Sequence, residues 1–200
     1  MPWQDYVAQL VGARRPDGRP RFKTVVASTP RQSGKTIISR AATVARARQD
    51  EFLELYGTAQ SRIYAAKHVV NLGKILKRRG EANVLMGVGA EKVEWANGSI
   101  YRPLSPTDGG GHGDSIDWML IDEGWKLESI VLGGVRPAMI ARPQSQMLVI
   151  STMGTIDSQV WNGLVERGRE SVAIAESDTA YLEFSAPTDE AVFEDTCSGD

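Results

Sequence analysis

Cysteine is almost absent from this chain of 200 residues, because Cys197 is the only one. One cysteine cannot form an internal disulfide, which excludes a small secreted scaffold held together by disulfides. No apolar run approaches the roughly 20 residues that cross a bilayer. The opening Met1-Pro2-Trp3-Gln4 also lacks the basic-then-apolar pattern of a secretory signal. We therefore expect a cytoplasmic protein with no membrane role.

What is present fits one globular domain, with 42% hydrophobic and 24% charged residues. The net charge of −2 conceals an asymmetry between the two parts of the chain. Residues 1–80 carry 16 Lys/Arg against 5 Asp/Glu, and residues 81–200 carry 7 against 20. Such a division is compatible with a basic surface for a polyanion, an acidic surface for a neighbouring subunit, or ordinary solvated surface.

Two strand-and-helix units are predicted in the first half of the chain. Thr24–Ala27 is a β-branched run, followed by a loop and a helix from Lys35 to about Arg48. Arg62–Ala66 is predicted as the second strand and Lys67 to about Arg79 as its helix. Four cations fall on one face of that second helix and suit either phosphate contacts or a solvated surface: Lys67, Lys74, Lys77 and Arg78.

The middle of the chain predicts a hairpin and then a buried strand. Val93–Ala96 and Ser99–Arg102 alternate on either side of Asn97-Gly98, the signal for a type I′ turn. We expect this hairpin to be an insertion between core strands. The glycine-rich loop Gly109–Gly113 then leads to Ile116–Ile121, a short apolar run typical of a strand buried on both faces.

The last third adds a helix from Glu128 to Ile140, a buried strand at Gln146–Ser151, and possible strands near 171–175 and 180–185. Strands that alternate with helices indicate a mostly parallel sheet with helices on both faces. The predicted fold class is therefore α/β.

Gly34-Lys35-Thr36 has the residue types that bind a nucleotide phosphate at the start of a helix. The helix offers backbone N–H donors, Lys35 a positive charge, and Thr36 a hydroxyl for Mg²⁺. The strict phosphate-loop pattern also requires a glycine where this chain has Thr29. Because the short motif also arises by chance, it needs support from a second motif.

Asp122-Glu123 supplies that second motif at the end of a predicted buried strand. An aspartate there can hold Mg²⁺, and the adjacent Glu123 can polarise the water that attacks the γ-phosphate. The alternative is that both residues open a surface turn or cap a helix. The combination of both motifs predicts a P-loop ATPase of the additional-strand, catalytic-glutamate type.

Three further residues have a functional and an ordinary interpretation. Ser151 and Thr152 follow the next buried strand, where hydroxyls can sense the γ-phosphate, although Ser/Thr/Gly turns are common there. Gln4 can pair with the adenine edge through its amide, although most glutamines are surface residues.

These motifs together resemble the ATPase domain of the large terminase subunit of tailed bacteriophages, the DNA-packaging motor. Pro2-Trp3-Gln4 resembles its adenine-reading motif and Arg31-Gln32-Ser33-Gly34-Lys35-Thr36 its deviant phosphate loop. Met119–Glu123 resembles its acidic strand end and Ser151-Thr152 its coupling motif. The resemblance covers residues 1–187. It implies that residues 188–200 are an acidic tail or a linker to a nuclease domain, with no nuclease activity in this chain.

The resemblance implies ATP and Mg²⁺ as ligands and double-stranded DNA, a portal protein and a small terminase subunit as partners. It implies a homo-oligomeric ring working in the cytoplasm of an infected bacterial cell. The catalytic residues would be Glu123, Lys35 and Arg31, and the metal ligands Thr36 and Asp122. The nucleotide-binding residues would be Gln4, Arg31, Gln32, Ser33, Gly34, Lys35, Thr36, Ser151 and Thr152.

The arginine finger of the family has no clear counterpart, because the corresponding neighbourhood contains Gly111-His112-Gly113. A histidine is only partly charged at neutral pH. Four arginines stay open as the cation: Arg31, Arg102, Arg136 and Arg142. Two other functions also stay open, namely a helicase or DNA-repair ATPase and a nucleotide-dependent binding module with negligible turnover.

Overall fold

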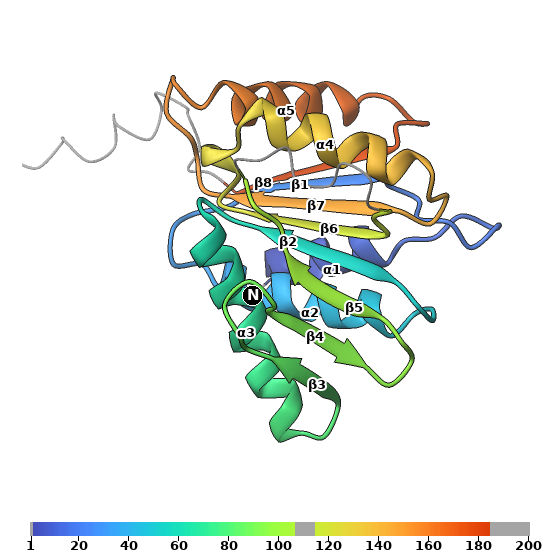
Figure 1. Cartoon of the computed structure of the whole chain (residues 1–200). Coiled ribbons are helices and arrows are strands. Elements are labelled where there is room, and N and C mark those ends of the chain that lie inside the picture. Colours follow the sequence, from blue (N-terminus) through green and yellow to red (C-terminus); the bar gives the residue numbers. More distant parts are fainter. Residues whose placement is uncertain (1, 107–114, 185–200) are drawn as a thin grey trace, which may run out of the picture.

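The computed structural model describes residues 2–106 and 115–184, which form one eight-stranded sheet between two layers of helices (Figure 1). The strands are β1 Thr24–Ser28, β2 Glu54–Thr58, β3 Ala82–Leu85, β4 Lys92–Trp95, β5 Ile100–Pro103, β6 Trp118–Asp122, β7 Gln146–Ser151 and β8 Thr179–Glu183. The helices are α1 Pro2–Gly12, α2 Lys35–Ala47, α3 Arg62–Arg78, α4 Ser129–Ile140 and α5 Gln159–Ser171, with a 3₁₀ turn η1 at Gly124–Lys126. The predicted α/β class is confirmed.

The strand order is β3-β4-β5-β2-β6-β7-β1-β8, with parallel pairing from β5 through β8 and an antiparallel β3-β4-β5 edge. Strand β7 therefore lies between β1 and β6. In this register Ser28 is opposite Ser151, and Asp122 is opposite Ile150. The carboxyl ends of β1, β2, β6 and β7 consequently meet at one edge of the sheet, where ligands bind in open α/β folds.

The two faces of the sheet pack against different helices because successive strand residues point to opposite sides. On β1, Val25 and Ala27 join the cluster formed with α1, α2 and α3, whereas Val26 joins the cluster formed with α4 and α5. Figure 1 shows α4 and α5 together on one side of the sheet and α1 and α2 on the other. Both faces are thus covered, which explains the unbroken apolar runs of β6 and β7.

Helix α2 is anchored at both ends of the sheet. It begins at Lys35 at the carboxyl edge, and its last turn carries Arg46, whose side chain is only 2% exposed. The Arg46 guanidinium donates to the Gln144 carbonyl at 2.7 Å, just before β7, and lies 3.3 Å from Asp50. The helix therefore connects the loop after β1 with the loop before β7.

The prediction of a strand at residues 62–66 is wrong, because these residues form the first turns of α3. The Ser61 hydroxyl accepts from the Tyr64 backbone N–H and caps the helix. Ala65 and Val69 face the core at helical spacing. The second parallel strand is instead β2, at residues 54–58, which pairs with β5 and β6.

The hairpin is confirmed in β4 and β5, but the predicted type I′ turn is wrong. That turn needs positive φ at both central residues, and only Gly98 has it, with φ 80°. The Asn97 amide instead donates to the carbonyls of Ala47 and Asp50 and ties the turn to the end of α2. The hairpin extends the sheet through the β5–β2 pairing rather than standing apart from it.

Later elements agree in part with the prediction. The predicted strand at Gln146–Ser151 is confirmed. The predicted helix that begins at Lys35 and the predicted helix that ends at Ile140 are also confirmed. The strand near 171–175 is wrong, because α5 extends to Ser171 and the last strand is β8. The Gly109–Gly113 loop, with His112, and the tail 188–200 lie outside the described residues. Within residues 2–106 and 115–184, no helix is long and apolar enough to cross a membrane.

Replacing Gly73 with Ala tests the packing of α3 on the antiparallel edge. A methyl group at Gly73 would lie 2.7 Å from Val84 Cγ1 and 3.0 Å from Val93 Cγ2. Overpacking of about 1–3 kcal/mol should outweigh the helix-propensity gain of about 1 kcal/mol, so we expect lower stability in urea unfolding. Gly133→Ala is the control, because a methyl group added at that exposed helical position would meet no atom within 4 Å beyond the adjoining helix backbone, and it should be neutral or stabilising. A Gly73→Ala protein as stable as Gly133→Ala would contradict this packing.

Candidate functional site

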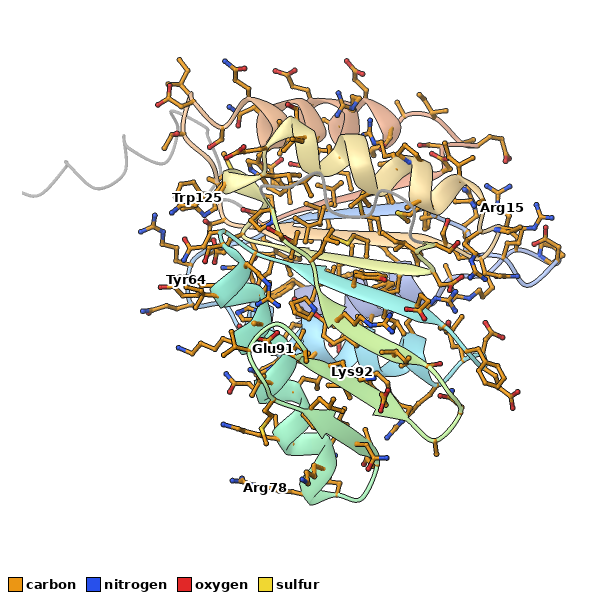
Figure 2. The ribbon with its side chains drawn as sticks, viewed as in Figure 1. Arg15, Tyr64, Arg78, Glu91, Lys92 and Trp125 are labelled. Atoms are coloured by element: carbon orange, nitrogen blue, oxygen red, sulfur yellow. The ribbon has the colours of Figure 1, made fainter. Side chains whose placement is uncertain are left out.

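A cavity of about 460 Å³ opens at the carboxyl edge of the sheet. Its lining comes from the loop after β1, the segment from the end of β2 into α3, the end of β6 with η1, and the residue after β7. The lining residues are Arg31, Gln32, Lys35, Thr36, Ala59, Gln60, Tyr64, His68, Asp122, Glu123, Trp125 and Thr152. Figure 2 shows Tyr64 and Trp125 on this side of the molecule, with Arg15 on the opposite side.

The loop between β1 and α2 has a backbone shape that depends on Gly34. Gly34 is the N-cap of α2 with φ 87°, a left-handed conformation that favours glycine, and no side chain caps the helix. Gln32 also has positive φ, 57°. The Gln4 amide of α1 donates to the Gly34 carbonyl at 3.1 Å and braces the loop from outside the cavity. The first N–H groups of α2 are thus left for an anion.

Lys35 is a buried cation whose partner is neutral. Its side chain is 9% exposed, and its Nζ donates to the Pro30 carbonyl at 3.2 Å. The Ser33 hydroxyl donates to the same carbonyl at 2.7 Å. Among the described residues, no carboxylate lies within 4 Å of the Lys35 ammonium group. A buried ammonium group with no carboxylate in direct contact is a ready binding point for a phosphate oxygen.

The acidic pair at the end of β6 is held in a fixed arrangement. Asp122 is 5% exposed, and its Oδ1 accepts from the Glu123 backbone N–H at 3.0 Å. Glu123 has the left-handed backbone with φ 58° and ψ 49°, which is uncommon outside glycine and costs on the order of 1 kcal/mol. The Trp125 indole N–H donates to Glu123 Oε2 at 2.6 Å. Both carboxylates therefore face the cavity from a turn that its neighbours stabilise.

Burial raises the pKa of Asp122 above its ordinary value. Electrostatic interactions with His68 and Lys35 oppose this rise in the pKa of Asp122, and the Glu123 carboxylate adds to it. The His68 Nδ1 lies 3.3 Å from Asp122 Oδ2. A carboxylate kept charged in such a place costs folding free energy, which suits a residue that serves a cation rather than the fold.

Sequence reasoning missed three lining residues with polar side chains from the segment around the start of α3: Gln60, Tyr64 and His68. The first follows β2 at the carboxyl edge, and the other two lie one turn apart on α3. The available signal was Ser61, a helix N-cap three residues after the end of a short strand. Arg62 fixes this helix start by an ion pair with Glu91 at 2.7 Å, which lowers the pKa of Glu91 to about 2.

The structure brings most of the predicted site residues together at the cavity. Seven line it: Arg31, Gln32, Lys35, Thr36, Asp122, Glu123 and Thr152. Gln4, Ser33 and Gly34 form or brace the loop behind it. Ser151 is fully buried, and its Oγ accepts from the Trp125 backbone N–H at 3.0 Å. Of the arginines held open, Arg102 pairs with Glu54, and Arg142 lies 3.9 Å from Asp117.

The donor set suits a magnesium nucleotide. Mg²⁺ in such sites takes one or two protein oxygens and completes its shell with water and phosphate oxygens. The Thr36 hydroxyl and the Asp122 carboxylate supply such oxygens in one cavity. Within the described part of the chain, no group of three or more His, Cys, Asp or Glu side chains forms a metal site by itself. The residues therefore fit a metal that arrives with phosphate oxygens.

Comparison with solved structures identifies the fold. The large terminase of bacteriophage HK97 has a TM-score of 0.76 and 18% identity, over 94% of this chain and 40% of that one. A large terminase from a thermophilic bacteriophage, in complex with ATP-γ-S, has a TM-score of 0.63 and 12% identity, over 89% and 43%. The ATPase domain of the Thermus phage P74-26 large terminase has a TM-score of 0.58 and 17% identity, over 89% and 84%.

The chain therefore has the fold of large terminase ATPase domains, and the predicted resemblance is confirmed at that level. It spans about 40% of the HK97 protein. No protein-family profile and no curated protein sequence matches the chain. The TM-scores show a shared fold. At such low sequence identities they show no more than the fold, so activity and partners are argued from the site.

Replacing Asp122 with Asn should stabilise the free protein at neutral pH. A raised folded-state pKa means that the ionised carboxylate disfavours folding, so stability falls as pH rises through that pKa. The gain in melting temperature should disappear below the unfolded-state pKa of about 3.9. Melting curves from pH 3.5 to 8 in EDTA measure this. Asp117→Asn is the control, since that buried carboxylate accepts from the Glu54 N–H, and it should give no gain. An Asp122→Asn protein that melts at or below wild type at pH 7 would contradict the argument.

Proposed function

We propose that this chain, which has the fold of large terminase ATPase domains, hydrolyses ATP to drive double-stranded DNA into a viral procapsid. One observation carries the proposal. A single cavity contains Lys35 and Thr36 from the loop after β1 and Asp122 and Glu123 from the end of β6. These residues would supply a phosphate anchor, metal ligands and a base at the edge where P-loop folds bind nucleotides.

Phosphate binding would fall to the loop and the start of α2. Lys35 exchanges its carbonyl partner for phosphate oxygens, and the uncapped N–H groups of the helix face the same charge. Arg31 and Gln32 line the mouth of the cavity and are exposed. Arg31 is thus placed to reach a phosphate within its own subunit. Gln4 would contact the adenine from α1, as the resemblance implies.

Thr36 and Asp122 would hold Mg²⁺, which neutralises phosphate charge when it is bound. Glu123 is the candidate base for the attacking water. In the hydrolytic step the water oxygen bonds to the γ-phosphorus while the bond from that phosphorus to the β–γ bridging oxygen breaks. ADP leaves with the electron pair, and the Glu123 carboxylate accepts the proton from water.

Thr152 and Ser151 would couple hydrolysis to movement. Thr152 lines the cavity and can sense the γ-phosphate, while Ser151 contacts the backbone of η1 behind it. Because β7 lies between β1 and β6, its end touches both the phosphate loop and the acidic turn. Release of the γ-phosphate would therefore change the contacts at the end of β7, a strand at the centre of the sheet.

The partners would be double-stranded DNA, a portal protein and a small terminase subunit, with several copies in a ring. Four exposed cations of α3 support the DNA contact, because none has a carboxylate partner within the described residues: Lys67, Lys74, Lys77 and Arg78. Cations of this kind bind phosphate backbones without sequence preference. The working place would be the cytoplasm of an infected bacterial cell.

Two other functions remain as alternatives from the sequence. A helicase or repair ATPase would separate or remodel strands, so strand displacement by the purified chain distinguishes it from a packaging motor. A binding module would bind nucleotide without turnover. Glu123 at the cavity argues against the module, because binding alone needs no base there.

The Lys35→Ala and Glu123→Gln variants should separate binding from chemistry. Lys35→Ala removes charge compensation, so we expect ATP affinity to fall by tenfold or more, about 1.4 kcal/mol. Glu123→Gln keeps the shape and loses the base, so affinity should hold while kcat falls by about 10²-fold or more. Calorimetry and a phosphate-release assay measure both. Unchanged turnover in Glu123→Gln would reject Glu123 as the base.

Turnover per subunit should rise with protein concentration and fall with added salt. A ring places a cation of one subunit at the nucleotide of the next, an effect worth roughly 10³-fold for arginine fingers. Salt would weaken contacts between the basic residues 1–80 of one subunit and the acidic residues 81–200 of the next, because charges are screened over about 8–10 Å at physiological ionic strength. Arg136 is the first cation to test, because it is exposed and has no carboxylate partner within the described residues. Fast, concentration-independent turnover in a demonstrated monomer would reject a trans-acting cation and favour Arg31.

A further inference from the structure

The turn after β6 places an indole directly on the candidate base. The Trp125 Nε1–H donates to Glu123 Oε2 at 2.6 Å, a short contact typical of a charged acceptor. An indole N–H only donates, so it holds the carboxylate as an acceptor. Among the described residues, no donor reaches the other oxygen, Oε1. One oxygen is therefore held, and the other is left for water in the cavity.

The backbone of Trp125 is held from the centre of the sheet. The Trp125 backbone N–H donates to the Ser151 Oγ at 3.0 Å, and Ser151 is fully buried at the end of β7. The exposed Lys126 ammonium group lies over the Trp125 ring, 4.8 Å from its centroid, and makes no contact with Glu123 that the described residues show. The turn also packs closely against β7 at Gly124, where an added methyl group would lie 2.9 Å from Val149 Cγ1.

We propose that Trp125 is the positioning residue for Glu123 and that Ser151 acts on the base through it. The proposal rests on the proposed ATPase function and adds a route within it. The path runs from the Ser151 hydroxyl to the Trp125 backbone, and from the Trp125 indole to the Glu123 carboxylate. A shift at the end of β7 thereby changes where the base points without any contact between Ser151 and the nucleotide.

The route predicts a specific kinetic pattern. Trp125→Phe keeps an aromatic ring and loses the donor, so we expect kcat to fall by about 10- to 100-fold, as expected for a misplaced catalytic group. The KM for ATP should stay within about threefold. In a Glu123→Gln background the same change should have no further effect, because no base remains to be positioned. Ser151→Ala should behave in the same way with a smaller loss.

A matched control and an isosteric variant sharpen the test. Lys126→Ala removes the cation above the same ring and should leave kcat within twofold. Substituting 3-benzothienylalanine at position 125 keeps the indole shape and replaces its N–H with sulfur, so it should reproduce the loss seen with Trp125→Phe. If Trp125→Phe does not fold, this isostere gives the kinetic answer.

Fluorescence reports the contact without any turnover. The emission of Trp125, taken as the difference between wild type and Trp125→Phe, should shift when Glu123→Ala removes the acceptor. An unchanged Trp125 emission in Glu123→Ala would overturn the contact. Equal kcat in wild type and Trp125→Phe, or an undiminished loss in the Glu123→Gln background, would overturn the positioning role while the ATPase stands. A wild-type protein without ATP hydrolysis would reject the proposed function and the route with it.

Discussion

The register of the parallel strands is the constraint on which the site depends. β7 lies between β1 and β6, so the phosphate loop, Ser151 and the acidic turn emerge side by side from one edge. A slip of one residue in β6 would turn Asp122 toward the other face of the sheet. The buried alternation of Leu120 and Ile121 between the two cores resists that slip. The packing of the two cores beneath the cavity thus sets the position of Asp122 relative to Lys35.

The elements that hold this register were also those that the sequence predicted best. β7 and α2 were found because an apolar β-branched run and a phosphate-loop motif are local signals. The Asp122-Glu123 pair was placed correctly at a strand end, since that strand is buried on both faces and reads as continuous apolar residues. Local pattern and global packing agree at these positions, which is the condition under which sequence reasoning works.

Prediction failed where a contact distant in sequence decides the structure. Residues 54–58 contain Gly57, which weakens a strand signal, yet Gly57 is required because a methyl group there would collide with the buried Tyr101 ring. Moving the strand to residues 62–66 hid Tyr64 and His68 from the expected site. Trp125 was missed for a related reason. Nothing in its sequence position shows that its indole turns back onto Glu123, since that depends on the left-handed backbone of Glu123 and on Ser151.

Helix α2 has a mechanical consequence beyond its N-terminus. It is 13 residues long, about 20 Å, and both ends are fastened. One end carries Lys35 at the cavity. At the other end, the Arg46 guanidinium donates a hydrogen bond to the Gln144 carbonyl at the opposite edge of the sheet. A helix of this length behaves as a stiff rod, so its ends cannot shift independently. A displacement of the phosphate loop would therefore be transmitted along α2 to the loop before β7, at the opposite edge of the sheet.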